Sequence, residues 1–143
     1  MRKILSILIF LTILSARSPY TYVYLLPFDN IQNDPAVEWI AGGLTDMVHQ
    51  ELKNHLGLRM KTKEDLEIIM NDRSLMLKQP RGSRNLLILG KFNRQLDKVH
   101  VSIQMVDVAT WEELAVRKIM EVYTQIPSLN KAVGTAVNQM ITP

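Results

Sequence analysis

VHVSIQM, residues 99–105, alternates apolar and polar side chains without interruption. Because successive side chains of a strand point to opposite faces of a sheet, this pattern predicts a strand with one face in the core. Asp107 to Trp111 then turns the chain, and a return strand follows. The connection is too short for a parallel crossover, so the two strands pair antiparallel. The apolar stripe of the return strand lies at Leu114, Val116, Met120 and Val122, with Lys118 as its exception.

The first part of the chain alternates strand and helix patterns. Tyr20 to Leu26 is rich in aromatic and β-branched residues and predicts the first strand. A helical apolar pattern begins at Val37. We expect Asp34 to cap this helix with Pro35 at its first position, and Gly57 to end it.

Gly42 and Gly43 lie inside this predicted helix. Two internal glycines cost roughly 1 kcal/mol each relative to alanine, so they need a structural reason. A phosphate-binding loop is not indicated, because the lysine and the Ser or Thr of a P-loop do not follow. We expect either a close approach of the helix to the sheet or a helix that starts near residue 42.

Strand and helix patterns continue to the centre of the chain. Leu58 to Lys61 predicts a short second strand, and Thr62 with Asp65 forms a variant of the capping box that starts a second helix. A polar break with proline and glycine follows at residues 79–83. Asn85 to Phe92 is apolar on both faces, which is typical of a central strand. The expected inward face of the second helix is Leu66, Ile69 and Met70.

The predicted elements therefore follow the order strand, helix, strand, helix, three strands, helix. We predict a single α/β domain over residues 20–143, with a mixed sheet of about five strands and about three helices. Its last helix covers residues 127–141, and we expect the helices to lie on one face of the sheet. The apolar stripe of that helix is Leu129, Ala132, Val133, Ala136, Val137 and Met140.

Residues 1–16 have the layout of a secretory signal. Arg2 and Lys3 precede an apolar run from Ile4 to Leu14, and the small residues Ser15 and Ala16 follow. The run is shorter than the roughly 20 residues that a helix needs to cross a bilayer. We expect cleavage after Ala16, with an uncleaved membrane anchor as the alternative. The sequence has no cysteine, so we expect neither a lipoprotein anchor nor disulfides.

The predicted signal also supplies two of the three net positive charges. The whole chain has 17 Lys and Arg against 14 Asp and Glu. Without Arg2 and Lys3 the balance is 15 against 14. A nucleic-acid-binding protein needs a basic face to neutralise phosphates, so this class is disfavoured.

No catalytic or metal-binding constellation stands out in the sequence. Cysteine chemistry is excluded by composition, and there is no G-x-S-x-G turn for a nucleophilic serine. His49 and His55 are six residues apart and cannot share one helix face, and His100 lies on the expected solvent face of a strand. We therefore predict a non-enzyme without cofactor or metal.

Four side chains are the candidates for contacts with a partner. Trp111 lies at the tip of the predicted hairpin, where an exposed indole would act as a binding anchor, although it can also fold onto the neighbouring strand. Trp39 is the second tryptophan. Arg81 and Arg84 belong to the central break, where the alternatives are contact with an anionic surface and a solvated loop.

Short motifs over residues 22–122 resemble the TolB-like amino-terminal domain. The stretch Leu25–Asn30, LLPFDN, is similar to the LPF-x-N opening of that family, and Glu38–Asp46, EWIAGGLTD, to its FADGLTD helix start. Leu89–Lys91 lies where the family has a strand that ends in LxG, and Val99–Trp111 is similar to the family's hairpin, with Trp111 in place of a turn glycine. Leu58–Ile69 is also similar to the CsgG- and FlgO-like envelope proteins, which share this general architecture.

The resemblance implies a non-enzymatic module of the bacterial envelope. We therefore expect a periplasmic or envelope-associated domain that docks onto a protein complex. The expected partners are envelope proteins, such as an outer-membrane or assembly complex, and an uncleaved signal would add membrane contact. The alternative is a protein that binds a small ligand or anion at the first helix N-terminus. Asp34, Glu38 and Asp46 disfavour an anion there.

Overall fold

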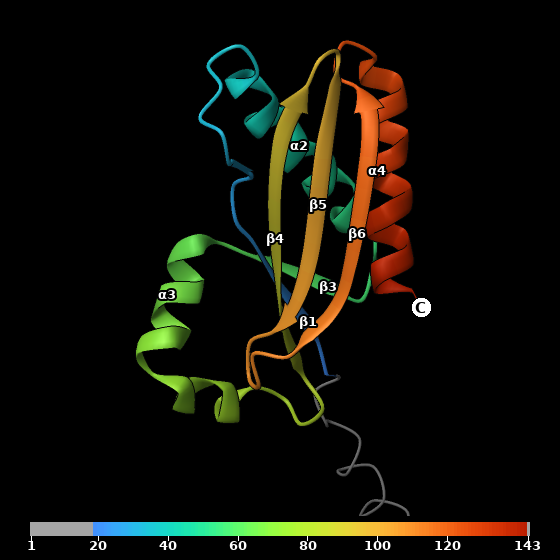
Figure 1. The fold of residues 1–143 in the computed structure, drawn as a ribbon. Coiled ribbons are helices and arrows are strands. Elements are labelled where there is room, and N and C mark those ends of the chain that lie inside the picture. The colour runs from blue at the N-terminus through green and yellow to red at the C-terminus, as the bar shows by residue number, and fades with distance from the viewer. Residues whose placement is uncertain (1–18, 143) are drawn as a thin grey trace, which may run out of the picture.

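The computed structural model describes residues 19–142, in which six strands form one mixed sheet (Figure 1). The order across the sheet is β3-β1-β4-β5-β6, and β2 pairs with β4 beyond the end of β1. β1 runs parallel to β3 and β4, whereas β4, β5 and β6 pair antiparallel. The strands are β1 Thr21–Leu25, β2 Asp29–Asn30, β3 Leu58–Lys61, β4 Arg84–Gln95, β5 Lys98–Asp107 and β6 Glu113–Val122.

Helices provide the crossovers that the parallel strands need. α2, Glu38–Lys53, connects β2 to β3, and α3, Lys63–Asn71, leads with the 3-10 helix η1, Arg73–Lys78, to β4. α4, Ile126–Ile141, follows β6 and ends the described chain. The predicted fold class and element order are confirmed. The two-residue β2 and the 3-10 helix η1 were not predicted.

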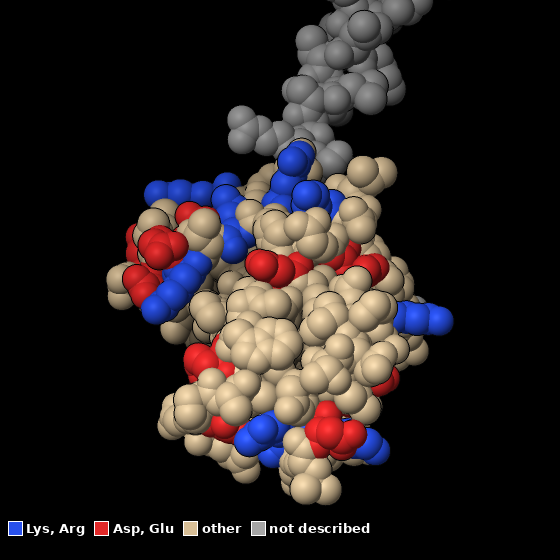
Figure 2. Space-filling model, turned by 90° about the horizontal axis from the view of Figure 1, so that it is seen from above, with Lys and Arg blue, Asp and Glu red and all other residues tan. Residues whose placement is uncertain are grey.

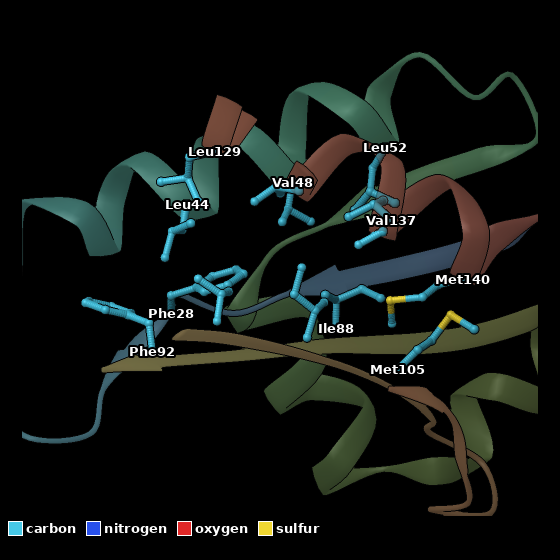
Figure 3. Packing of buried hydrophobic residues seen from close by; sticks show 14 of the residues in the cluster. Phe28, Leu44, Val48, Leu52, Ile88, Phe92, Met105, Leu129, Val137 and Met140 are labelled. Carbon is cyan, nitrogen blue, oxygen red and sulfur yellow. The ribbon is translucent and has the colours of Figure 1, made fainter. Parts of the chain in front are cut away.

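The main core lies between the sheet and the helices α2 and α4 (Figure 3). α2 contributes Leu44, Val48 and Leu52, and α4 contributes Leu129 and Val137. They pack on the alternate residues of β4 and β5 that point to the same face, which confirms the predicted inward side of β5. The sheet residues of this core are Val23, Leu86, Ile88, Phe92, Val99, Val101, Ile103 and Met105.

α3 lies on the opposite face of the sheet, near one end (Figure 1). Its Leu66 and Ile69 pack against Tyr24, Leu87 and Val108, which form a second, smaller cluster. The expectation that all helices cover one face was therefore wrong for α3. Because β1 and β4 are buried on both faces at this end, a helix is needed on each side.

Two predicted features of the first helix are corrected. Asp34 does not cap α2, which begins after Val37 without a side-chain cap. The Asp34 carboxylate instead accepts a hydrogen bond from the Ala36 N–H and pairs with Arg94 at 2.9 Å. The helix ends at Lys53, so the turn through Asn54 separates it from Gly57.

Gly42 and Gly43 lie within α2, so the helix does not start near residue 42. Nor does the sheet approach them closely, because a β-carbon at either position would meet nothing within 4 Å. Neither predicted explanation for these glycines holds.

Two predicted apolar positions also differ from the structure. Met70 of α3 is 40% exposed, whereas Leu66 and Ile69 are the buried residues of this helix. In β6 the register pairs Val101 with Ile119 and Met105 with Ala115, so Ile119 and Ala115 face the helices. The predicted stripe through Val116 and Met120 therefore faces away from them.

Candidate interaction surface

Three of the four predicted partner-binding residues lie at one end of the sheet. Arg84 begins β4 and its N–H donates to the Tyr20 carbonyl, and Arg81 lies in the turn just before it. The loop from β5 to β6, which carries Trp111, reaches the same end, because Val108 N–H donates to the Asn85 carbonyl at 2.9 Å. Trp111, Arg81 and Arg84 thus share one end of the molecule.

Trp111 is half-exposed at the tip of this hairpin. Its backbone has φ of 61°, in the left-handed region, and its N–H donates to the Asp107 carbonyl at 2.7 Å. The Arg73 guanidinium lies over the indole, 5.9 Å from the ring centroid, and donates to the carbonyls of Val108 and Ala109. One face of the indole is thus supported by Arg73, while 47% of the residue is left to solvent.

Trp39 lies at the opposite end, in the first turn of α2. It is 57% exposed, and its indole N–H donates to the Ala36 carbonyl at 3.1 Å. Ile31, Leu96 and Ile126 are also exposed and belong to segments at this end. Figure 2 views the end directly and shows a broad central area without charged side chains, bordered by acidic and basic ones. The structure therefore separates the two tryptophans.

The free edge of β6 adjoins the hairpin that carries Trp111. β6 is the last strand of the sheet, and Tyr123 N–H donates to the Asp97 carbonyl beyond its end at 3.2 Å. Hydrogen-bonded and non-hydrogen-bonded pairs alternate in an antiparallel ladder. Tyr123 and Asp97 form a hydrogen-bonded pair, so Tyr123 and every second residue before it direct their backbone groups toward β5. The N–H and carbonyl groups of Lys118, Met120 and Val122 therefore point away from β5.

A groove of about 590 Å³ runs beside this edge, between β6 and α4. The α4 side is lined mostly by small side chains, at Ser128, Ala132 and Thr135. The β6 side is formed by residues 117–121. Edge strands usually carry features that prevent unwanted pairing. Here the Arg117 side chain donates to the outward Val116 carbonyl at 2.8 Å, which occupies one acceptor at the start of the groove.

The groove carries more positive than negative charge. Arg117, Lys118 and Lys131 line it, against Glu121. Among residues 19–142 the only ion pair joins Arg94 to Asp34, so the cations of the groove have no carboxylate partner there. An acidic ligand would meet them without displacing an existing pair.

A buried polar network lies under α3 rather than in a cleft. The Tyr24 hydroxyl donates to Asn85 Oδ1 at 3.0 Å, and the Asn85 and Gln79 side-chain amides bond each other in both directions. Burial raises the pKa of Tyr24 to about 12, with a smaller contribution from the Asp65 carboxylate. Perturbed groups often mark functional sites. This tyrosine is 1% exposed and fully bonded, so its role is structural.

Metal and anion sites are not indicated by the geometry. No group of three or more His, Asp or Glu side chains in residues 19–142 is arranged to hold a metal ion. At the start of α2, the Glu38 carboxylate accepts a hydrogen bond from Asn30 Nδ2 at 2.6 Å. The same Asn30 Nδ2 donates to the Asp34 backbone carbonyl, which places Asp34 near Glu38. These carboxylates disfavour an anion at this helix N-terminus. His55 bonds Asn138 at 2.8 Å and links the turn after α2 to α4.

None of the helices in residues 19–142 has the length and apolar character that spanning a bilayer requires. The predicted signal at residues 1–16 lies outside the described residues.

Solved structures share this fold at low sequence identity. TolB from Acinetobacter baumannii matches with a TM-score of 0.57 at 17% identity over 89% of this chain. PelC from Paraburkholderia phytofirmans, solved as a dodecamer, gives 0.53 at 12% identity over 87% of this chain and 91% of that one. Lipoprotein GNA1162 from Neisseria meningitidis gives 0.50 at 17% identity over 85% and 96%. The chain spans 29% of the TolB chain.

These similarities show the fold and leave the activity open. The chain is a single-domain α/β protein that shares its fold with a part of TolB, as its motifs predicted. No protein-family model matches the sequence, and no curated protein matches it. The relation to CsgG- and FlgO-like proteins stays a prediction.

Proposed function

We propose that this protein is an exported, non-enzymatic interaction domain of the bacterial cell envelope that docks onto a protein complex. The proposal combines the signal layout of residues 1–16 with the fold shared with TolB and with a lipoprotein. Export without lipidation is part of it, because the sequence contains no cysteine.

The observation that carries the proposal is the free edge of β6 next to the half-exposed Trp111. The hairpin tip leads directly into this edge, since β6 begins two residues after Trp111. Aromatic anchors beside desolvated contacts supply much of the energy of protein interfaces. A rigid strand edge supplies oriented backbone groups over the same surface. Trp111 precedes the start of β6, and the free stretch of the edge lies farther along the same strand. We call the tip and the edge together the β6 surface.

Cross-linking in native cells tests this function. The full chain carries a photo-cross-linking amino acid at Thr135, in the α4 wall of the groove, and the attached proteins are identified by mass spectrometry. When the chain carries no substitution other than the cross-linker at Thr135, we expect it to capture a defined envelope protein. We expect Trp111→Gly to reduce that capture, because it removes the indole without introducing backbone strain at this left-handed position.

Trp39→Ala is the matched control, since Trp39 is similarly exposed but lies at the other end of the molecule. It should leave capture unchanged. If the cross-linker at Thr135 captures no envelope protein, or if Trp39→Ala abolishes capture and Trp111→Gly does not, docking through the β6 surface is wrong.

A further inference from the structure

The β6 edge and its groove also indicate what kind of partner they fit. We propose that the β6 surface binds an extended, acidic segment of another envelope protein, which adds to the sheet as a further strand next to β6. The inference rests on the proposed function and names the chemistry of its partner.

The backbone geometry defines the part of the edge that can pair. The N–H and carbonyl groups of Lys118, Met120 and Val122 point outward. This follows from the hydrogen-bonded pair of Tyr123 and Asp97, because hydrogen-bonded and non-hydrogen-bonded pairs alternate along β5 and β6. The Val116 carbonyl is already occupied by the Arg117 side chain. The free stretch therefore begins at Lys118 and extends to the end of β6.

The groove provides space for the added strand and for its side chains. An added strand would lie about 4.8 Å from β6, with alternate side chains pointing toward α4. Ser128, Ala132 and Thr135 are small and leave room for those side chains. On the other face the added strand would lie beside Met120, which is 53% exposed.

Charge selects the composition of the added strand. Its side chains on the α4 side would meet Arg117 and Lys131, and Glu121 is the single acidic residue of the groove. Acidic residues at alternate positions would thus pair with cations that have no partner in residues 19–142. Apolar residues at the other positions would pack beside Met120.

A second copy of this chain fits the same edge poorly. α4 packs against β6 and runs along the outer edge of the sheet (Figure 1). Two copies that paired through β6 around a two-fold axis would bring both α4 helices into the same space. A single extended segment has no such helix, so we assign the edge to a heterologous partner.

Proline at Met120 is the sharpest probe of strand addition. Met120→Pro removes an outward N–H, and proline is tolerated on edge strands where the N–H faces solvent. Met120→Ala removes the same side chain but keeps the N–H. A partner that uses only the side chain is weakened by both changes, whereas an added strand is weakened mainly by proline. Thermal unfolding of both variants checks that they are folded.

The binding probe is a fluorescent peptide of about ten residues that alternates valine with glutamate, compared with one that alternates valine with lysine. Fluorescence anisotropy gives the dissociation constants. We expect wild type and Met120→Ala to bind the acidic peptide, and Met120→Pro to bind it at least about tenfold more weakly. The basic peptide and the Lys131→Glu variant should each show similar losses, and added salt should weaken binding.

Hydrogen exchange gives a second readout. The Met120 and Lys118 amides should become protected when the acidic peptide is added to wild type. Equal binding by Met120→Pro and Met120→Ala, equal affinity for both peptides, or no binding of the acidic peptide would overturn strand addition. A wild-type dimer that Met120→Pro dissociates would instead assign the edge to a second copy.

The cross-linking experiment separates this inference from the function itself. If Met120→Pro retains the envelope partner captured at Thr135, strand addition is wrong and docking through the β6 surface stands. If wild type captures no partner, the proposed function fails.

Discussion

Phe28 fills the space over Gly90, so that a β-carbon on Gly90 would lie 2.4 Å from Cε2 and Cζ of the Phe28 ring. Gly90 alternates in β4 with Ile88 and Phe92, whose side chains point into the main core (Figure 3). Both residues belong to motifs that resemble the TolB-like domain. Their contact explains why a phenylalanine after Pro27 requires a glycine in β4.

Gly90→Ala should destabilise the protein. The added methyl group must displace a ring that is 4% exposed and packed on all sides. Overpacking of this kind costs about 1–3 kcal/mol in the free energy of unfolding. Urea denaturation of wild type and variant measures the difference.

The double variant Phe28→Leu with Gly90→Ala is the control for that contact. Phe28→Leu alone should be destabilising, but the second change should then add little, because the smaller side chain leaves room. Additive effects in this double-mutant cycle would show that the clash is not with Phe28.

Replacing Trp111 should separate binding from folding. Glycine relieves about 1 kcal/mol of strain at the left-handed backbone and loses a cation–π contact of similar size. We expect Trp111→Gly to unfold within about 1 kcal/mol of wild type, and Trp111→Ala to be less stable than Trp111→Gly by about 1 kcal/mol. Thermal unfolding compares the two variants, and a more stable alanine variant would contradict the backbone assignment.

Alanine at Gly42 or Gly43 should stabilise the protein. Both glycines are inside α2, and a β-carbon meets nothing within 4 Å at either position. Each change should raise the free energy of unfolding by about 1 kcal/mol. Gly134→Ala in α4 is the matched control with a smaller gain, because its β-carbon would lie 3.0 Å from Glu51 Oε2. A loss of stability at Gly42 in urea denaturation would show that a β-carbon at this position does not lie in open space.

Stability should fall between pH 10 and about 12 because of Tyr24. Its pKa rises from 10.0 to about 12 on folding, mainly through burial, so the unfolded chain loses this proton first. Below pH 10 the group contributes fully, and its contribution of about 2–3 kcal/mol is lost as the pH rises through the folded value.

Tyr24→Phe isolates this effect. It removes one hydrogen bond to Asn85 and should lower stability by about 1 kcal/mol below pH 10. Above that pH its stability should fall less steeply than that of wild type. Parallel pH profiles for the two proteins would show that another group causes the alkaline loss.

Local patterns determined most of the elements. The alternation of residues 99–105 predicted β5 and its buried face, and the Thr62–Asp65 capping box marked the start of α3 with both of its hydrogen bonds present. The apolar stripe of α4 was correct at five of its six positions, and Ala132 is instead half-buried beside the groove. These signals are local, because each depends on neighbours along the chain.

Features that depend on pairing between distant residues were missed or misplaced. β2 exists only because Asp29 and Asn30 meet Lys91 and Phe92, and two residues carry too little pattern to reveal it. The inward face of β6 follows from its register with β5. A shift of one residue exchanges the two faces of a strand, and β6 has apolar residues on both.

By itself, the sequence determined the α/β class, the order of the elements and the export signal layout. Each of these follows from periodicity, capping and composition, which depend on residues that are neighbours along the chain. Only the tertiary structure decided that Trp111 and Trp39 lie at opposite ends, that Phe28 closes over Gly90, and that β6 is left with a free edge beside α4. Each of these depends on which surfaces the sheet order brings together, and no local pattern encodes that order.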